Sequence, residues 1–479
     1  MMLHKKGVGM LLHKGRMLTR ISMIPAIASA MMTAPQMAHA QEEASDKIDD
    51  IVVTARKRSE SQRDVPVAIS AVTGGQLVAN NIAVLRDLVV STPALTLNYG
   101  SISPFTLVRG FGSGASTSFD QAVGKFIDNI SFGRDQDARI PLFDVERVEV
   151  LKGPQVLVFG NSSTAGAINV ATKRPGQNFE ATGSVAYEFN NNEVLTQGGV
   201  TTPVSDAVSL RLAGFYQRLA KGWIKNAAFG GSAAPTIKNF AFRPTLRIEP
   251  SPDLRIYLKA EYDRIREDGG ALQPYIASTN PLVKFTEVNL DDHRNVSNAG
   301  APFFNSDDFV HLTSYVYQGD INWDILGGTL TSTTAYRHSK INNYLDADML
   351  PVAIFGGSSR QRYKQFSQEI RFNGNVGKLD YVLGGYYEHD KLEVLATQNF
   401  NLAPAGIPLP PFSRVLTFDN ETGAYSAFVD ATYHFTDRLS LEAGVRWTKT
   451  DKNGVQSSNP GNIIPHAERA DRAATGLSL

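Results

Sequence analysis

The chain of 479 residues carries 47 basic and 47 acidic side chains and no cysteine. Because its Lys and Arg residues are neither in excess nor clustered, we expect no nucleic acid partner. The lack of cysteine excludes disulfides and thiolate metal sites. No apolar run reaches the roughly 18 residues that a membrane-spanning helix needs. A membrane protein of this composition would have to cross as a β-barrel, the other fold that satisfies its backbone in lipid.

Residues 1–40 have the features of a signal peptide. Five basic residues and no acid precede an apolar run from Ile21 to Met32, and Ala38-His39-Ala40 forms a small-residue cleavage signal. An amphipathic helix kept in the mature protein is the alternative. We expect residues 1–40 to be removed and the rest of the chain to be exported.

A short β-prone run lies in the polar segment 41–58, which looks too charged to fold alone. Its β-branched side chains are stiff and favour an extended backbone. Such a peptide can add a strand to the edge of a partner's sheet through main-chain hydrogen bonds. Taken alone, the run could equally be the first strand of the domain that follows. Its residues are Asp50, Ile51, Val52, Val53, Thr54 and Ala55.

The most informative stretch is Val145–Val170, which reads VERVEVLKGPQVLVFGNSSTAGAINV. Two β-prone runs flank the turn signal at Lys152-Gly153-Pro154, and further glycines suit tight turns and close backbone contacts. This order of residues resembles the second half of the plug domain of TonB-dependent outer-membrane receptors. The run at Asp50–Ala55 resembles the TonB box of the same family. An ordinary β-meander would explain the glycines but not the order.

The resemblance implies a plug domain over residues 59–175. Within it, the spacing of apolar residues from Gly74 to Leu88 predicts a helix. Relatives use basic residues of two plug motifs to pair with glutamates of the barrel wall. The matching positions here are Arg109 and Lys152, with Glu369 as the barrel partner; ordinary solvated charges are the alternative.

From residue 176 to 450 the chain alternates apolar and polar residues along successive segments, as in Leu254–Tyr262 and Tyr425–Phe435. A soluble β-sandwich gives the same alternation. Short turns near 203–206, 250–253, 324–328, 374–378 and 435–438 alternate with long connections near 221–236, 266–308, 343–360 and 391–422. This asymmetry is typical of an outer-membrane barrel.

The predicted fold is therefore an all-β membrane barrel with an N-terminal α+β plug in its lumen. About eleven strands fit between 176 and 450, whereas the resemblance implies roughly 22. Residues 451–479 look like a polar tail or a truncated loop, so we expect a receptor truncated at its C-terminus. An open half barrel would leave backbone groups unpaired in hydrocarbon.

Motifs of hydrolases, metalloproteases and nucleotide-binding loops are missing from the sequence, so we expect neither an enzyme nor a cofactor or metal site. The resemblance implies active uptake of a scarce large solute, with a ferric siderophore as the leading class. It also implies three partners: TonB with its inner-membrane energising complex, outer-membrane lipid including lipopolysaccharide, and the ligand. A passive porin-like channel, and an inactive truncated or surface-binding protein, remain alternatives.

The ligand is expected where plug loops meet aromatic residues of the long barrel loops, because aromatic-rimmed concavities with few charges are usual binding sites. Each of these aromatic residues could instead pack a loop or lie at the membrane interface. The candidates are Tyr99, Phe105, Phe111, Phe119, Tyr275, Phe303, Phe304 and Phe400.

Overall fold

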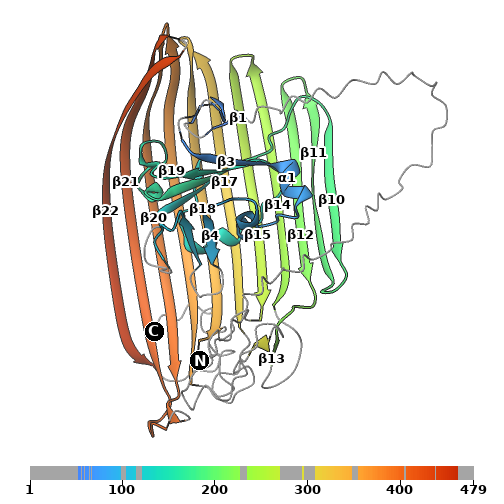
Figure 1. The fold of residues 1–479 in the computed structure, drawn as a ribbon, viewed down its shortest axis with the longest axis vertical. Coiled ribbons are helices and arrows are strands. Elements are labelled where there is room, and N and C mark those ends of the chain that lie inside the picture. The colour runs from blue at the N-terminus through green and yellow to red at the C-terminus, as the bar shows by residue number, and fades with distance from the viewer. Residues whose placement is uncertain are drawn as a thin grey trace, which may run out of the picture.

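The computed structural model describes residues 52–461, apart from residues 55–56, 59, 64, 66, 99–103, 115–120, 227–234, 270–293, 296–307, 348–353, 404–405 and 437. A tall curved wall of long strands surrounds a small domain that lies across its hollow side (Figure 1). In the described residues no helix is long and apolar enough to cross a membrane. The predicted signal peptide lies outside the described residues.

The enclosed domain, which we call the plug, is built on a five-stranded sheet with the order β3-β8-β9-β6-β7. β6 and β9 pair in parallel, and the other neighbours in the sheet are antiparallel. Apolar side chains cover both faces of β8 and β9, which explains their nearly continuous burial. The elements are β3 (Ile69–Thr73), α1 (Gly74–Ala79), η1 (Leu85–Val90), β4 (Leu95–Asn98), β5 (Phe105–Val108), β6 (Val123–Ile127), β7 (Ile130–Ser131), η2 (Asp135–Arg139), β8 (Val145–Lys152), α2 (Val156–Phe159), η3 (Asn161–Ser163) and β9 (Gly166–Thr172).

The helix predicted from Gly74 to Leu88 is wrong as one element. Thr73 caps α1 through a reciprocal capping box with Gln76, and α1 ends at Ala79. Asn81 then takes a left-handed backbone with φ 52°, which an asparagine tolerates better than most residues. The apolar spacing resumes only in the 3₁₀ helix η1.

The wall is one antiparallel sheet of eleven strands with the order β10-β11-β12-β14-β15-β17-β18-β19-β20-β21-β22. Each wall strand therefore pairs with the wall strands that come before and after it in the chain, and β10 and β22 form the two edges of the sheet. The strands are β10 (Glu180–Glu188), β11 (Glu193–Ser205), β12 (Val208–Leu219), β14 (Thr236–Ser251), β15 (Leu254–Asp268), β17 (Phe309–Ile325), β18 (Gly328–Asp346), β19 (Phe355–Val376), β20 (Leu379–Phe400), β21 (Phe412–Thr436) and β22 (Leu439–Gly461). Two short pairs complete the fold, β1 (Val52–Val53) with β2 (Glu60–Ser61), and β13 (Lys225–Asn226) with β16 (Arg294–Asn295).

The five predicted short turns are confirmed, since β11–β12, β14–β15, β17–β18, β19–β20 and β21–β22 all join at one end of the wall. The predicted long connection 391–422 is too long at both ends. Residues 391–400 belong to β20 and residues 412–422 to β21, because cross-strand pairing continues there. The predicted end of the barrel segment at residue 450 is also wrong, because β22 stays paired with β21 as far as Gly461.

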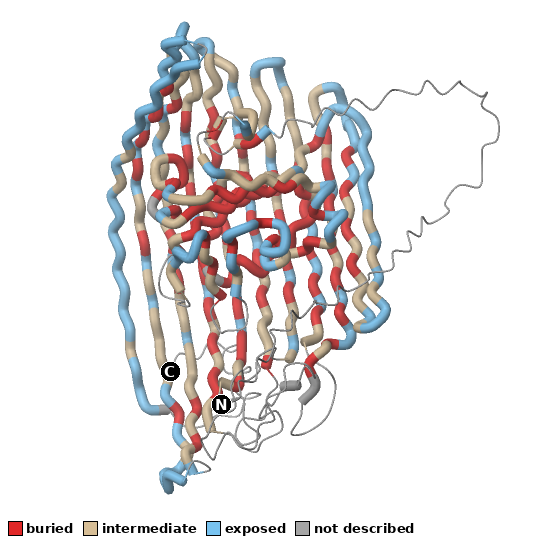
Figure 2. Tube along the Cα trace, in the orientation of Figure 1, coloured by how far each residue is buried: buried red, intermediate tan, exposed pale blue. Residues whose placement is uncertain are grey.

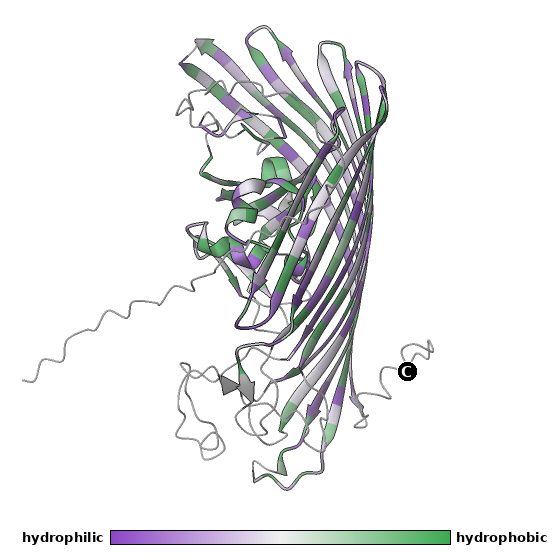
Figure 3. Ribbon diagram, turned by 90° about the vertical axis from the view of Figure 1, so that its right-hand side faces the viewer, coloured by the Kyte–Doolittle hydropathy of each residue, from purple (hydrophilic) through white to green (hydrophobic). Residues whose placement is uncertain are grey.

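Burial alternates along the wall strands, as the sequence pattern predicts. In β18, Thr333, Ala335 and Arg337 are buried toward the plug, whereas Thr334 and Tyr336 are exposed on the outer face. Buried residues recur along the inner face of the wall, both beside the plug and toward the end with the long connections (Figure 2). Val316 and Ala335 of the wall pack into the main apolar cluster of the plug. Hydrophobic and hydrophilic residues alternate along the wall strands (Figure 3), and large hydrophobic residues such as Tyr317, Ile321 and Trp323 of β17 are exposed.

Candidate functional site

The first described residues form a small hairpin that is docked on the plug. Val52 and Val53 of β1 pair with Ser61 and Glu60 of β2. Val53 is fully buried, in a cluster with Leu151 and Phe126 of the plug. Val52 and Val53 therefore have the extended backbone that the sequence predicts, but they are already paired with β2 of the same chain.

Polar contacts continue this docking. The Thr54 amide donates to Glu149 Oε1 at 2.7 Å, and Arg147 Nη2 donates to Thr54 Oγ1 at 3.0 Å. Glu149 is itself fully buried in the centre of β8. Asp50, Ile51 and Ala55 of the predicted TonB box lie outside the described residues. The part of the box that is described is thus fixed to the middle of the plug sheet.

Lys57 fixes the same segment to the wall. Its ammonium group forms a buried ion pair with Glu369 of β19, and Asn373 Nδ2 donates to the Lys57 carbonyl at 3.2 Å. Next to it, Arg58 Nη2 donates to Thr432 Oγ1 of β21 at 3.0 Å. Three side chains from two wall strands therefore hold two consecutive residues of the N-terminal segment.

Opposing influences act on the charge of Lys57 in this contact. Glu369 is shared, because Arg371 Nη1 also lies 2.8 Å from its other carboxylate oxygen. Burial lowers the pKa of Lys57 to about 8; Glu369 opposes this shift, while the cations Arg371 and Arg446 add to it. Lys57 also takes a left-handed backbone with φ 59°. The position is unusual for a lysine in both its charge environment and its backbone.

The predicted pairing of Arg109 and Lys152 with Glu369 is not present. Within the described residues, the ion pairs of Glu369 are those with Lys57 and Arg371. Arg109 is exposed and follows β5 at a turn with φ 53°, while Lys152 is half-buried at the end of β8. The sequence motifs assigned Arg109 and Lys152 to the plug. Whether either residue can pair with Glu369 depends on which loop of the plug lies next to β19, and the motifs do not contain this information. Lys57, close to the predicted TonB box, was missed because it belongs to no motif.

Other buried ion pairs join plug and wall. Lys259 Nζ of β15 lies 2.7 Å from Asp128 Oδ2, Arg211 Nε of β12 lies 2.7 Å from Asp144 Oδ2, and Arg337 Nη2 of β18 lies 2.9 Å from Asp137 Oδ1. Arg337 also donates to the Ser131 carbonyl at 2.7 Å. Lys259, Arg211 and Arg337 each occupy an inward-facing position of a strand whose residues alternate between the two faces. A basic residue at such a position is the sequence signal that could have indicated these contacts.

The buried carboxyl of Asp128 keeps its charge because of its neighbours. Burial works against its charge, but Lys259 and Arg174 outweigh burial, and the pKa of Asp128 falls well below its ordinary value. Thr172 adds hydrogen bonds, its amide donating to Asp128 Oδ1 at 2.8 Å and its hydroxyl to Asp128 Oδ2 at 2.6 Å. The charged Asp128 of the plug is therefore paired with Lys259 of the wall.

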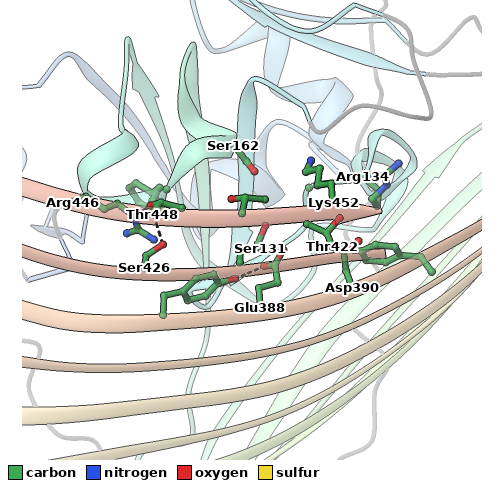
Figure 4. Close-up of a pocket in the computed structure, with 17 residues that line it drawn as sticks. Ser131, Arg134, Ser162, Glu388, Asp390, Thr422, Ser426, Arg446, Thr448 and Lys452 are labelled. Carbon is green, nitrogen blue, oxygen red and sulfur yellow. Dashed lines mark hydrogen bonds between the residues drawn. The ribbon is translucent and has the colours of Figure 1, made fainter. Parts of the chain in front are cut away.

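A polar recess lies between the plug and the wall strands β19 to β22 (Figure 4). Arg134 and Ser162 of the plug face Glu388, Asp390 and the Ser426–Thr448 hydrogen bond of 3.0 Å. Charged and hydroxyl groups on both sides suit water or a polar solute. The recess is not the apolar, aromatic-rimmed pocket that the sequence led us to expect for the ligand.

Three of the eight predicted ligand residues are described. Phe105 lies on β5, in the β4–β5 hairpin on the side of the plug toward the long connections (Figure 1). Phe111 is 71% exposed beyond that hairpin. Phe400 stacks between Phe355 and Phe412, with ring centroids 4.9 and 5.0 Å apart, on three neighbouring strands. Tyr99, Phe119, Tyr275, Phe303 and Phe304 lie outside the described residues.

Comparison with known proteins gives one consistent result. Residues 61–167 match the TonB-dependent receptor plug domain, and residues 241–476 match the TonB-dependent receptor-like β-barrel. The pesticin receptor of Yersinia enterocolitica is 23% identical over 90% of this chain and 60% of its own length. The ferrioxamine B receptor of Salmonella typhimurium is 26% identical over 41% of this chain and 28% of its own.

Solved structures share the fold. The ferric yersiniabactin uptake receptor of Yersinia pestis superposes with a TM-score of 0.67 at 18% identity, over 82% of this chain and 60% of that one. The ferripyoverdine receptor of Pseudomonas aeruginosa gives 0.66 at 15% identity, over 86% and 56%. The chain thus spans about 60% of the length of relatives such as the pesticin receptor.

Proposed function

Because the chain belongs to the TonB-dependent receptor family, we propose that it binds a ferric siderophore at the cell surface and imports it when TonB pulls on its N-terminal segment. The chain is an outer-membrane protein of a Gram-negative bacterium. Receptors for yersiniabactin, pyoverdine and ferrioxamine B among its relatives support the siderophore class. The relatives are receptors rather than enzymes.

The observation that carries the proposal is the docked β1–β2 hairpin. A TonB box acts by lending its backbone edge to a partner's sheet. Here Val52 and Val53 are paired with β2, and Val53 is buried. A receptor that keeps this strand paired until its ligand arrives avoids engaging TonB when there is nothing to import. The contacts of Thr54 with Glu149 and of Lys57 with Glu369 would keep the strand docked.

Three partners follow from this function. TonB, with its inner-membrane energising complex, would take the released strand on the side of the short turns. Lipid of the outer membrane, including lipopolysaccharide, would cover the apolar outer face of the wall. The ferric siderophore would enter from the side of the long connections, where Phe105 and Phe111 lie.

Uptake of radioactive iron tests the function. Cells that lack other siderophore receptors and produce this protein would receive catecholate, hydroxamate and phenolate ferric siderophores, with and without a protonophore. Uptake of at least one of them that stops with the protonophore is the expected result. Uptake that continues would indicate a passive channel, and binding without uptake would indicate a surface-binding protein.

A further inference from the structure

One buried carboxylate of the wall has no partner among the residues that the structure describes. Asp263 occupies an inward position of β15 and is fully buried. Neither of its carboxylate oxygens takes part there in a hydrogen bond or an ion pair. Buried charges in proteins are paired or bind a metal ion, because an isolated charge is strongly destabilised away from water. Asp263 therefore requires a compensating positive charge.

The cations that act electrostatically on Asp263 each have an acid of their own. The pairs are Arg243 with Glu261 at 2.5 Å, Lys259 with Asp128 at 2.7 Å and Arg337 with Asp137 at 2.9 Å. Arg337 stands on β18, two strands from β15, where its guanidinium carbon lies 3.6 Å from the centre of the Phe132 ring and Nη1 donates to the Ser131 carbonyl. Asp263 is therefore the surplus negative charge of this group.

Two more buried oxygen atoms without a hydrogen-bond partner in the described part of the chain lie beside Asp263. Ser314 of β17 stands directly opposite it, at a distance of about 5 Å between Cβ atoms for such pairs, and its hydroxyl is buried. Glu261 lies two residues earlier on the same face of β15; its Oε2 pairs with Arg243, whereas Oε1 is the unpaired atom. We call Asp263 Oδ1 and Oδ2, Glu261 Oε1 and Ser314 Oγ the oxygen site.

The 3₁₀ helix η2 of the plug passes over the oxygen site. Its Asp137 pairs with Arg337 of β18, and its Arg139 pairs with Glu267 of β15. In the register of the strands these two wall residues lie on either side of the row that contains Asp263. The oxygen site is therefore enclosed between the wall and the plug.

The chemistry of the oxygen site selects its ligand. Hard cations prefer oxygen ligands. One negative charge is surplus, so a singly charged ion balances the group, whereas a doubly charged ion would leave a buried positive charge beside Arg243 and Lys259. The described ranges of the chain hold no group of three or more acidic, His or Cys side chains able to bind a metal ion, which disfavours transition metals.

We propose that the oxygen site binds a sodium or potassium ion, which neutralises Asp263 where the plug meets the wall. The ion adds to the direct ion pairs that join plug and wall. The site goes beyond the proposed function and does not depend on it, because no step of ligand uptake enters the argument.

Thermal unfolding of the protein, purified from outer membranes in mild detergent, tests the site. The midpoint is followed by gel mobility in sodium, potassium or choline chloride at equal ionic strength and neutral pH, with calcium chloride as a fourth salt. Choline supplies the same screening but is too large for the site. Asp263→Asn removes the surplus charge, and Ser314→Ala removes one oxygen. Asp268→Asn, an exposed acid on the same strand, is the matched control.

An ion that binds the folded protein alone stabilises it by mass action. The midpoints of the wild-type and control proteins should therefore rise by about 2 °C or more when sodium or potassium replaces choline. Asp263→Asn should have the same midpoint in every salt. Ser314→Ala should need about tenfold more cation for half of the shift, as expected for one lost bond to a charged group.

Equal wild-type midpoints in choline and in both alkali salts would overturn the site, and so would a cation response that Asp263→Asn retains. A response to calcium alone would overturn the choice of a singly charged ion. A wild-type midpoint that ignores the salt but rises as pH falls from 8 to 5 would assign a proton, shared with Glu261, in place of the ion.

A second measurement covers the case in which Asp263→Asn does not fold. Wild-type protein should broaden the NMR signal of sodium ions, and potassium should reverse the broadening by competition. Ser314→Ala should broaden the signal less at the same concentration. Absence of broadening by the wild-type protein, or equal broadening by Ser314→Ala, would overturn the site. Iron uptake is not part of either readout, so failure of the proposed function would leave these results unchanged.

Discussion

The ammonium group of Lys57 forms a buried ion pair with Glu369 of β19. In the chain, Lys57 follows the buried Val53 by four positions. The pair joins the segment that we propose as the TonB contact to strand β19 of the wall. Breaking a buried ion pair from one side leaves the other charge uncompensated and costs about 3–5 kcal/mol. Lys57 and Glu369 are therefore placed to control how readily the β1–β2 hairpin is released.

Glu369→Gln should release the hairpin. The chain has no cysteine, so Val53→Cys introduces a single buried thiol that maleimide reaches only when the hairpin undocks. We expect labelling at least tenfold faster with Glu369→Gln than without it, given the cost of a broken buried pair. Glu421→Gln, an exposed acid on β21, is the control and should leave the rate unchanged. Equal rates in all three proteins would show that the pair does not hold the hairpin.

Docking should tighten as pH rises through the range set by Lys57. Its folded pKa of about 8 lies below the 10.5 of the free side chain, so the undocked segment binds more protons between these values. Raising pH across this window therefore favours the docked state, by up to about 3 kcal/mol. A spin label at Val52→Cys should lose its mobile component from pH 8 to 10. Lys57→Met should abolish this pH dependence, and a mobile component that grows instead would contradict the assigned shift.

Asp128→Asn should loosen the plug. Lys259 would then be buried without its carboxylate, at a cost of about 3–5 kcal/mol. The folded pKa of Asp128 is lowered, so its contribution to stability is present above the ordinary carboxyl pKa of about 4 and is lost as pH falls below it. Thermal unfolding of the folded form, followed by its gel mobility, should show a lower midpoint at pH 7. The difference from wild type should shrink in acid; a constant difference would assign the effect to packing.

Proline at Val52 or Val53 should abolish uptake and leave ligand binding intact. Proline removes an amide donor from the strand and disfavours sheet pairing, both in the hairpin and with TonB. Binding of radioactive ferric siderophore to whole cells and its uptake are measured side by side. Val52→Ala is the control at the same position. Normal uptake by the proline variant would refute the TonB-box assignment.

Local patterns predicted most of the architecture. The alternating strands, such as Tyr425–Phe435, were predicted from their two-residue period, and the five short turns were predicted from their turn-forming residues. Both signals act over a few residues. Strand lengths beyond the expected membrane zone were missed, because the outer parts of β20 and β21 mix apolar and polar residues in the way a long loop also can. Only their continued cross-strand pairing reveals them as strands.

The site was less predictable, because it depends on contacts between distant residues. Motifs identified Val52, Val53 and Glu369, but the partner of Glu369 lies 312 positions away in the chain. Nothing near Lys57 in the sequence marks it as buried.

The orientation of β3 has a mechanical consequence. β3 is an edge strand of the plug sheet, and it lies across the long strands of the wall rather than along them (Figure 1). A pull along the axis of the wall on the segment ahead of Ile69 therefore acts across the β3–β8 ladder. Such a load opens hydrogen bonds one after another, beginning at Ile69 and Leu151, instead of shearing all of them together. A weak, sustained force could peel away this edge while β8, β9 and β6 remain paired.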